Sequence, residues 1–142
     1  MRAALFDSSV YISGIRRGDD AVLAQRRLSP DTLLWLSSVV LEELYAGAWG
    51  QIRDSVERLE HDFERARRIL VPNLGDWTQA GRVLARVAAK YGYEKIGQGR
   101  LTNDALIAMS AARIGARVIT VNERDFRKLA EFRSFQWETG IF

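Results

Sequence analysis

Short apolar runs alternate with longer stretches of helical periodicity along the chain. The apolar runs at residues 3–6, 32–36 and 118–121 predict buried strands, and residues 69–72 and 134–137 predict two further extended segments. Helices are predicted at residues 10–17, 20–28, 38–47, 54–68, 76–91, 101–114 and 123–131, with Ser37 or Ser38 as the cap of the third. Strands that alternate with helices favour an α/β fold with a mostly parallel sheet and right-handed crossovers.

Two of the predicted helices differ in how their apolar residues are arranged. Residues 54–68 place Val56, Leu59, Phe63 and Ala66 on one stripe opposite a charged face, which is typical of a helix at the surface. Residues 101–114 are apolar nearly all round and predict a buried central helix, which Gly115 is well placed to end. Between the last two long helices, residues 92–100 hold three glycines and predict an irregular loop.

The composition is that of a globular protein with one domain. At 142 residues, 47% of them hydrophobic, the chain can bury a sizeable core, and we expect a single domain over residues 1–142. The absence of cysteine excludes a disulfide scaffold and a thiolate metal site, and the single histidine, His61, excludes a multi-histidine site. Its longest strongly apolar uncharged run, residues 32–41, is too short to span a bilayer, and no signal peptide is expected, so we expect a cytoplasmic protein.

Charge is distributed unevenly between the two halves of the chain. Residues 1–71 carry 10 basic and 11 acidic side chains, whereas residues 72–142 carry 11 and 7. Of the 21 basic residues 18 are arginine, the residue best suited to bidentate phosphate contacts. A genome rich in arginine codons produces the same bias, so charge alone does not identify a nucleic-acid partner.

Four acidic residues lie near the predicted carboxyl ends of the strands, where parallel sheets bind their ligands. Asp7 follows the first predicted strand and Asp125 follows the strand at residues 118–121, and ligands bind at the carboxyl ends of parallel strands. Glu43 lies on the helix after the second strand, and Asp104 is expected in the first turn of the buried helix. Each acid taken alone also has a structural explanation as a helix cap, a partner of the helix dipole or a surface carboxylate.

Two adjacent glutamates compete for one of these positions. Glu43 shares its helical face with small or apolar residues, namely Val39, Val40, Ala46 and Gly47. Glu42 shares its face with Ser38, Tyr45 and Trp49. The pattern therefore predicts that Glu43 is the inward carboxylate.

Four segments carry the acids in order along almost the whole chain. They are residues 6–10 (FDSSV), 39–47 (VVLEELYAG), 102–108 (TNDALIA) and 118–126 (VITVNERDF). These segments resemble the four motifs of PIN-domain nucleases, most closely the small single-domain toxins of the VapC type. The family often has asparagine where this chain has Ser9, and residues 76–100 match no motif.

The resemblance implies a PIN-like three-layer fold, in which helices flank a central, mostly parallel sheet. It also implies a metal-dependent endoribonuclease whose products carry 5′-phosphate and 3′-hydroxyl ends. Asp7, Glu43, Asp104 and Asp125 would then hold one or two Mg²⁺ or Mn²⁺ ions. The implied partners are an RNA substrate, a cognate antitoxin protein that covers the cleft, and a second copy of the chain in a homodimer.

Elementary chemistry agrees with a metal in such a site. Four carboxylates in one cleft repel one another unless they take up protons or bind a cation. A ligand set of oxygen atoms alone selects a hard ion such as Mg²⁺ or Mn²⁺. The remaining residues would carry a net charge of +7, which suits a polyanionic substrate.

Several further polar residues are candidates for supporting roles. Thr120 and Asn122 lie beside the acids, and the resemblance implies that a polar residue here can help to hold the metal or its water; helix capping by Asn122 is an equal alternative. Arg16, Arg17 and Arg100 are candidates for contacts to RNA phosphates, with a solvated surface role as the alternative.

Aromatic residues and glycines are assigned more conventional roles. The four tryptophans are expected in the core or at dimer contacts rather than as platforms for bases: Trp35, Trp49, Trp77 and Trp137. The glycines at residues 97–99 lack the remaining residues of a phosphate-binding loop, which excludes a nucleotide site of that kind.

Two other functions compete with the nuclease hypothesis. A phosphatase of the haloacid-dehalogenase type would use Asp7 as its nucleophile, but that class requires a second aspartate where this chain has Ser9. A PIN-like domain could also serve as a non-catalytic module for RNA binding or assembly. The presence of all four acids argues against that second alternative.

Overall fold

The computed structural model describes residues 2–16, 29–93 and 100–140. Six helices and five strands alternate within these ranges: β1 (Arg2–Phe6), α1 (Ser8–Arg16), β2 (Thr32–Ser37), α2 (Ser38–Gly47), α3 (Gln51–Arg65), β3 (Ile69–Leu70), α4 (Leu74–Tyr91), α5 (Arg100–Ile114), β4 (Arg117–Thr120), α6 (Glu123–Ala130) and β5 (Trp137–Thr139). The helix predicted at residues 20–28 lies outside the described residues.

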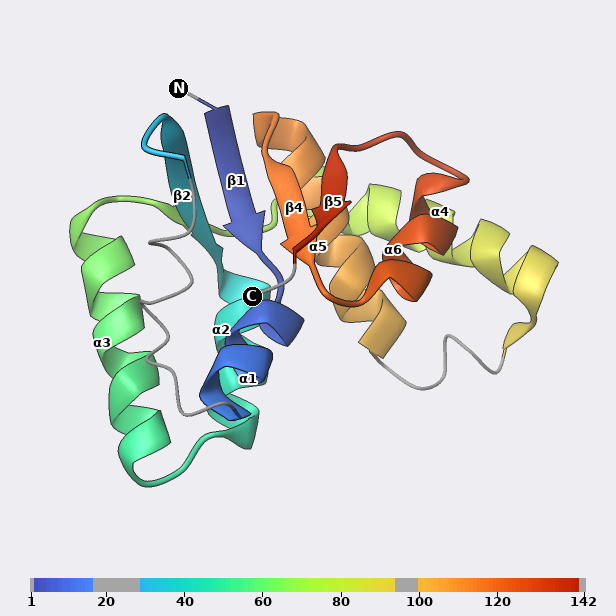
Figure 1. Cartoon of the computed structure of the whole chain (residues 1–142). Coiled ribbons are helices and arrows are strands. Elements are labelled where there is room, and N and C mark those ends of the chain that lie inside the picture. The colour runs from blue at the N-terminus through green and yellow to red at the C-terminus, as the bar shows by residue number, and fades with distance from the viewer. Residues whose placement is uncertain (1, 17–28, 94–99, 141–142) are drawn as a thin grey trace.

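All five strands form one parallel sheet in the order β3-β2-β1-β4-β5. Figure 1 shows α1, α2 and α3 on one side of the molecule and α4, α5 and α6 on the other. Right-handed crossovers place connections that step toward β3 and those that step toward β5 on opposite faces of the sheet. The predicted three-layer α/β fold with helices flanking a parallel sheet is confirmed.

Local capping groups explain where the helices begin. The Ser37 side chain accepts a hydrogen bond from the Val39 amide at 3.2 Å, which selects Ser37 over Ser38 as the cap of α2. Asn73 and Asp76 form a reciprocal capping box with distances of 2.9 and 3.0 Å. This box starts α4 at Leu74, two residues earlier than the sequence predicts.

Two other helix boundaries also differ from the prediction. Helix α3 is shifted toward the N-terminus relative to residues 54–68: it follows Gly50, whose φ is +61°, and ends at Arg65. Val56, Leu59 and Phe63 are buried as predicted, but Ala66 lies beyond the helix and is exposed. Asp104 is the fifth residue of α5, so the prediction that it lies in the first helical turn is wrong.

The sheet reverses its direction of growth between β1 and β4. From β1 the chain adds β2 and β3 on one side, and then returns to place β4 on the other side of β1. Leu5 pairs with Val118 and Phe6 with Ile119 across this junction. In parallel sheets the carboxyl ends of strands at such a reversal form a crevice.

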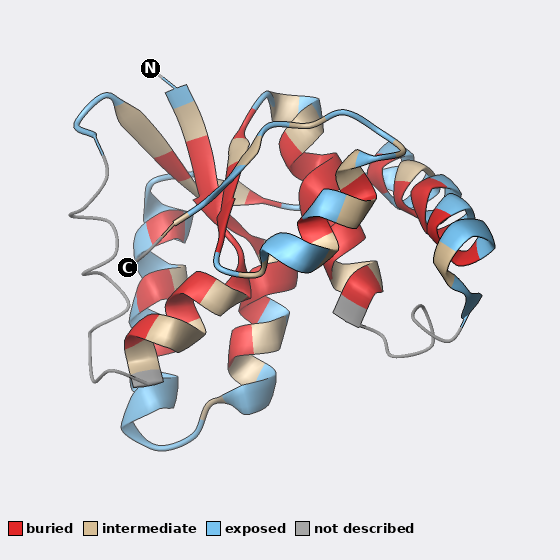
Figure 2. Cartoon of the chain, turned by 45° about the vertical axis from the view of Figure 1, so that its right-hand side comes forward, coloured by how far each residue is buried: buried red, intermediate tan, exposed pale blue. Residues whose placement is uncertain are grey.

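Helix α5 lies at the centre of the packed structure. An unbroken run of its residues, from Asp104 to Ala111, is buried, as the red colouring in Figure 2 shows. It contacts β1 and β4 on one side and α4 and α6 on the other. The apolar surface on all sides of this helix is therefore used, and Gly115, with φ +69°, ends it as predicted.

The tryptophans are divided between core and surface. Trp35 and Trp137 are partly buried against the core, as expected. Trp49 and Trp77 are 80% and 56% exposed, so a place in the core is wrong for both. None of the described helices is long and apolar enough to cross a membrane.

Candidate functional site

Asp7 lies at the carboxyl end of β1 and is held by two hydroxyl groups. Its side chain is 2% exposed. Thr120 Oγ1, from the end of β4, donates to Asp7 Oδ2 at 2.7 Å, and Ser9 Oγ donates to Asp7 Oδ1. Burial raises the pKa of Asp7, and the hydrogen bonds from Ser9 and Thr120 oppose that effect. The crevice at the β1–β4 junction thus contains a buried carboxylate in a fixed orientation.

A short relay of hydrogen bonds connects Asp7 to Asp125. The same Thr120 oxygen accepts a hydrogen bond from the Asn122 amide at 2.8 Å. The Asn122 side chain donates to Asp125 Oδ2 at 3.0 Å. Asn122 occupies the N-cap position of α6 without a side-chain cap bond, so its side chain orients Asp125 instead of capping the helix.

Glu43 is the inward member of the glutamate pair. It is partly buried, whereas Glu42 is exposed. Burial raises the pKa of Glu43, a hydrogen bond with Ser8 lowers it, and the negative charge of Asp7 raises it further. The burial of Glu43 relative to Glu42 agrees with the inward orientation that the helical-face pattern predicts. The part of that pattern formed by Ala46 and Gly47 is exposed, so only Val39 and Val40 lie on the core side.

Asp104 on α5 is buried, with 4% of its surface exposed. The residue before it, Asn103, donates to Glu42 Oε2 at 3.3 Å, and a hydrogen bond from Asn103 also lowers the pKa of Glu43. Helices α2 and α5 are therefore joined next to the acids. Among the described residues, however, no three acidic or histidine side chains are close enough to form a metal-binding group.

The chemistry of the donors nevertheless fits a hard cation. Glu43 Oε1 is buried and accepts no hydrogen bond in the described part of the chain. Such an oxygen is costly to bury as a charge unless a proton or a cation satisfies it. The neighbouring groups offer carboxylate and hydroxyl oxygens, which Mg²⁺ and Mn²⁺ prefer over softer ligands.

The predicted arginine contacts to RNA lie at the edges of the described structure. Arg16 ends α1 and Arg100 begins α5, while Arg17 lies outside the described residues. The side chains of all three are outside what the structure describes.

Three positioning residues were missed as site residues by the sequence analysis. Ser8 bonds to Glu43, Ser9 to Asp7, and Asn103 joins Glu42 and Glu43. Each directly neighbours an acid or lies two residues from it inside one of the four motifs. That adjacency was the available signal, since small polar residues beside a buried carboxylate commonly orient it.

Comparison with known proteins settles the family. The PIN domain profile matches residues 4–132. The chain belongs to the PIN domain family. No curated protein sequence matches it.

Solved structures similar to this PIN domain come from bacterial VapBC complexes. A chain of DNA-bound VapBC from Salmonella typhimurium is 21% identical with a TM-score of 0.69, over 98% of each chain. A chain of VapBC-1 from Haemophilus influenzae is 24% identical with a TM-score of 0.63, over 96% of this chain and 97% of that one. A chain of VapBC-5 from Mycobacterium tuberculosis is 26% identical with a TM-score of 0.52, over 98% of each. The predicted resemblance to VapC-type PIN domains is confirmed.

Proposed function

We propose that this PIN domain is a metal-dependent endoribonuclease that hydrolyses RNA phosphodiester bonds and acts as the toxin of a toxin–antitoxin pair. The observation that carries the proposal is the setting of Asp7. It is a buried carboxylate at the sheet reversal, fixed by Ser9 and Thr120, beside a second buried carboxylate oxygen of Glu43. Membership of the PIN domain family supports a nuclease.

The chain's own residues divide into ligands and positioning groups. Asp7, Glu43, Asp104 and Asp125 are the proposed ligands of Mg²⁺ or Mn²⁺, and one of them also positions the attacking water. A divalent ion held there would supply a Lewis acid that polarises the phosphoryl group and offsets the developing negative charge. Thr120 and Asn122 are proposed to act through Asp7 and Asp125, whose carboxylates they orient by hydrogen bonds. Hydrolysis would leave 5′-phosphate and 3′-hydroxyl ends.

The proposed partners follow from the same family relationship. The similar chains come from complexes named VapBC, one of them bound to DNA, which supports a cognate antitoxin as a protein partner here. The RNA substrate, the homodimer and the cytoplasmic location are proposals that accompany the toxin assignment.

The phosphatase alternative receives no support from the site. Ser9 occupies the position where that class needs a second aspartate, and its hydroxyl is committed to Asp7. An acid that is buried and bonded to two hydroxyl groups is better suited to orienting a cation than to forming a phosphoryl-enzyme.

Cleavage of a single-stranded RNA in Mn²⁺, Mg²⁺ or chelator tests the nuclease. We expect cleavage with either metal, none in chelator, and products that a 5′-phosphate-dependent exonuclease degrades. Metal should also raise the melting temperature, because an ion that binds only the native state at 100 times its Kd adds about 2.7 kcal/mol of stability.

The Asp7→Asn variant is the control for both measurements, since it removes one proposed ligand. Persistent cleavage in chelator, or an equal metal-induced shift in wild type and Asp7→Asn, would contradict the metal site. Metal binding without cleavage of any RNA would instead favour the non-catalytic module.

A further inference from the structure

A second surface of the molecule contains three arginines that no carboxylate neutralises. Arg82 and Arg86 on α4, together with Arg133 after α6, line a hollow of about 460 Å³. We call this surface the arginine groove. Its remaining lining is Gln79, Val83, Ala85 and Phe132, with no acidic residue.

Two of the three arginines of the groove, Arg86 and Arg133, contact neutral partners. The Arg86 guanidinium lies 5.7 Å from the centre of the Phe132 ring, and Arg133 Nη1 donates to Gln79 Oε1 at 3.2 Å. None of the three forms an ion pair with a described carboxylate, whereas Arg53, Arg113 and Arg117 do. The groove therefore gathers three positive charges that no carboxylate of the described residues pairs with, and two of these side chains are held in place by their neutral partners.

The carboxylate nearest in sequence does not change this charge balance. Glu131 accepts hydrogen bonds from Tyr91 at 2.7 Å and from Lys90 at 3.1 Å, and these bonds lower the pKa of Glu131. The Lys128 ammonium lies 4.9 Å from the centre of the Tyr91 ring. Two lysines thus surround this single acid, and the surface beside the groove remains positive.

Helix α6 connects the groove to the acidic site. Asp125 and Lys128 lie one helical turn apart on α6, and Phe132 of the groove follows two residues after that helix ends. The eight residues of α6 span about 12 Å at 1.5 Å per residue. Helices α4 and α6 pack against each other (Figure 1), and the three arginines line the same hollow.

We propose that the arginine groove binds the phosphate backbone of the RNA strand that occupies the acidic site. This inference rests on the proposed function. Arg82 and Arg86 are one helical turn apart, with Cβ atoms about 5–6 Å from each other, so both side chains can reach phosphates of one strand. Planar guanidinium groups can form bidentate contacts with phosphate oxygens, which makes arginine well suited to this role.

The test measures how tightly the protein binds a fluorescently labelled oligouridine of twelve nucleotides in the presence of chelator. Binding is measured by fluorescence anisotropy at several salt concentrations. Chelator separates binding from cleavage. We expect the triple variant R82A/R86A/R133A to weaken binding about tenfold or more. The slope of log K against log salt should fall by about 2, because each lost phosphate contact on a single strand removes about 0.7.

Two further variants make the result specific. The triple variant R53A/R58A/R65A removes the same charge from exposed positions of α3 and should change binding by less than about twofold, because these positions lie off the proposed path. The variant R82K/R86K/R133K keeps the charge and should retain the salt slope while it loses part of the affinity, since lysine cannot form the bidentate contact. It also provides a result if the alanine variant does not fold.

Two outcomes would overturn the groove as an RNA site, and a third would reject only the nuclease. Equal weakening by both alanine variants would indicate a general effect of net charge. Unchanged RNA binding by R82A/R86A/R133A would remove the proposal, and a simultaneous loss of binding to an acidic peptide would assign the groove to a protein partner. Groove-dependent RNA binding by a wild type that cleaves no RNA would leave the groove standing and reject the nuclease.

Discussion

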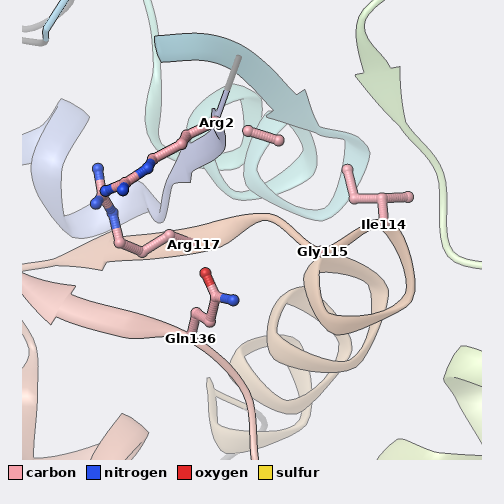
Figure 3. Close-up of a pocket in the computed structure, with 6 residues that line it drawn as sticks. Arg2, Ile114, Gly115, Arg117 and Gln136 are labelled. Atoms are coloured by element: carbon pink, nitrogen blue, oxygen red, sulfur yellow. The ribbon is translucent and has the colours of Figure 1, made fainter. Parts of the chain in front are cut away.

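The two ends of the central strands carry opposite charge in very different surroundings. At their carboxyl ends, Asp7 and Thr120 are 2% and 0% exposed and bond to each other. At their amino ends, Arg2 and Arg117 line hollows of about 490 and 450 Å³. Figure 3 shows both arginine side chains extending to the same side of the strands.

The difference shows how burial determines what a charge does. Arg2 is exposed, and Arg117 forms an ion pair with Glu138 at 3.3 Å, so water and a partner stabilise the positive charges. At the other end, burial raises the pKa values of Asp7 and Glu43, and Glu43 Oε1 accepts no hydrogen bond from the described residues. Only the carboxyl end therefore has a physical need for a cation.

The strongest way to break this comparison is Glu43→Gln. We expect RNA cleavage to fall by more than about 100-fold, beyond the range typical of residues that only orient a metal ligand. Glu42→Gln is the matched control and should retain activity within about twofold, because Glu42 is exposed. Equal activities of the two folded variants would show that the carboxylate assignment on α2 is wrong.

A comparison of two buried aspartates, Asp104 and Asp76, distinguishes a functional role from a structural one. Asp104→Asn should reduce cleavage by more than about 100-fold while the denaturation midpoint in chelator stays equal or rises, because the amide avoids burying a charge. Asp76→Asn should lower the free energy of unfolding by about 1–2 kcal/mol, and the midpoint with it, because Asp76 caps α4 and pairs with Arg113. Cleavage corrected for the folded fraction should survive in Asp76→Asn. A strongly destabilised yet active Asp104→Asn would reverse the assignment.

The orienting hydroxyl of Thr120 is expected to have a smaller effect. Thr120→Val removes the hydrogen bond to Asp7 and should lower cleavage and Mn²⁺ affinity by about 10–100-fold. Thr120→Ser keeps the hydroxyl and should recover most of the loss. The control Thr139→Val changes the exposed partner of Thr120 on β5. If Thr120→Val binds Mn²⁺ as tightly as wild type, Thr120 has no role in positioning the ligand.

The smallest effect is expected at the amino ends of the strands. Arg117→Ala breaks the ion pair with Glu138 and should cost no more than about 1 kcal/mol of unfolding free energy. Its cleavage rate should stay within about twofold of wild type. A large loss of cleavage without unfolding would mean that the two ends of the sheet are functionally coupled. That result would contradict the view that only the carboxyl ends of the strands take part in cleavage.

Residues that act through local patterns were predicted well from the sequence. The alternation of apolar runs located β1 to β4, whereas the last strand was predicted at residues 134–137 and lies at Trp137–Thr139. The helical face of α2 distinguished Glu43 from Glu42. Capping depends on side chains only a few residues away, yet the box at Asn73 and Asp76 was overlooked, so α4 was predicted to start too late.

Features that depend on distant segments could not be predicted in the same way. The bonds that Asp7 makes require β4 to lie beside β1, and the Gln79–Arg133 contact joins residues 54 positions apart. The exposure of Trp49 and Trp77 depends equally on which helix faces remain uncovered. Local periodicity contains no information about these approaches, so the arginine groove was visible only in the folded chain.

The hydrogen bond between Asp7 and Thr120 also has a consequence for synthesis of the protein. Its two residues are 113 positions apart, and β4 can join the sheet only after all the residues between β1 and β4 have been made. A ribosome that has produced β1, β2 and β3 therefore exposes a nascent chain with Asp7 in place but without the strand that orients it. The carboxylate of Asp7 is therefore oriented by Thr120 only once β4 has been synthesised and has paired with β1, because a contact between such distant segments cannot form earlier.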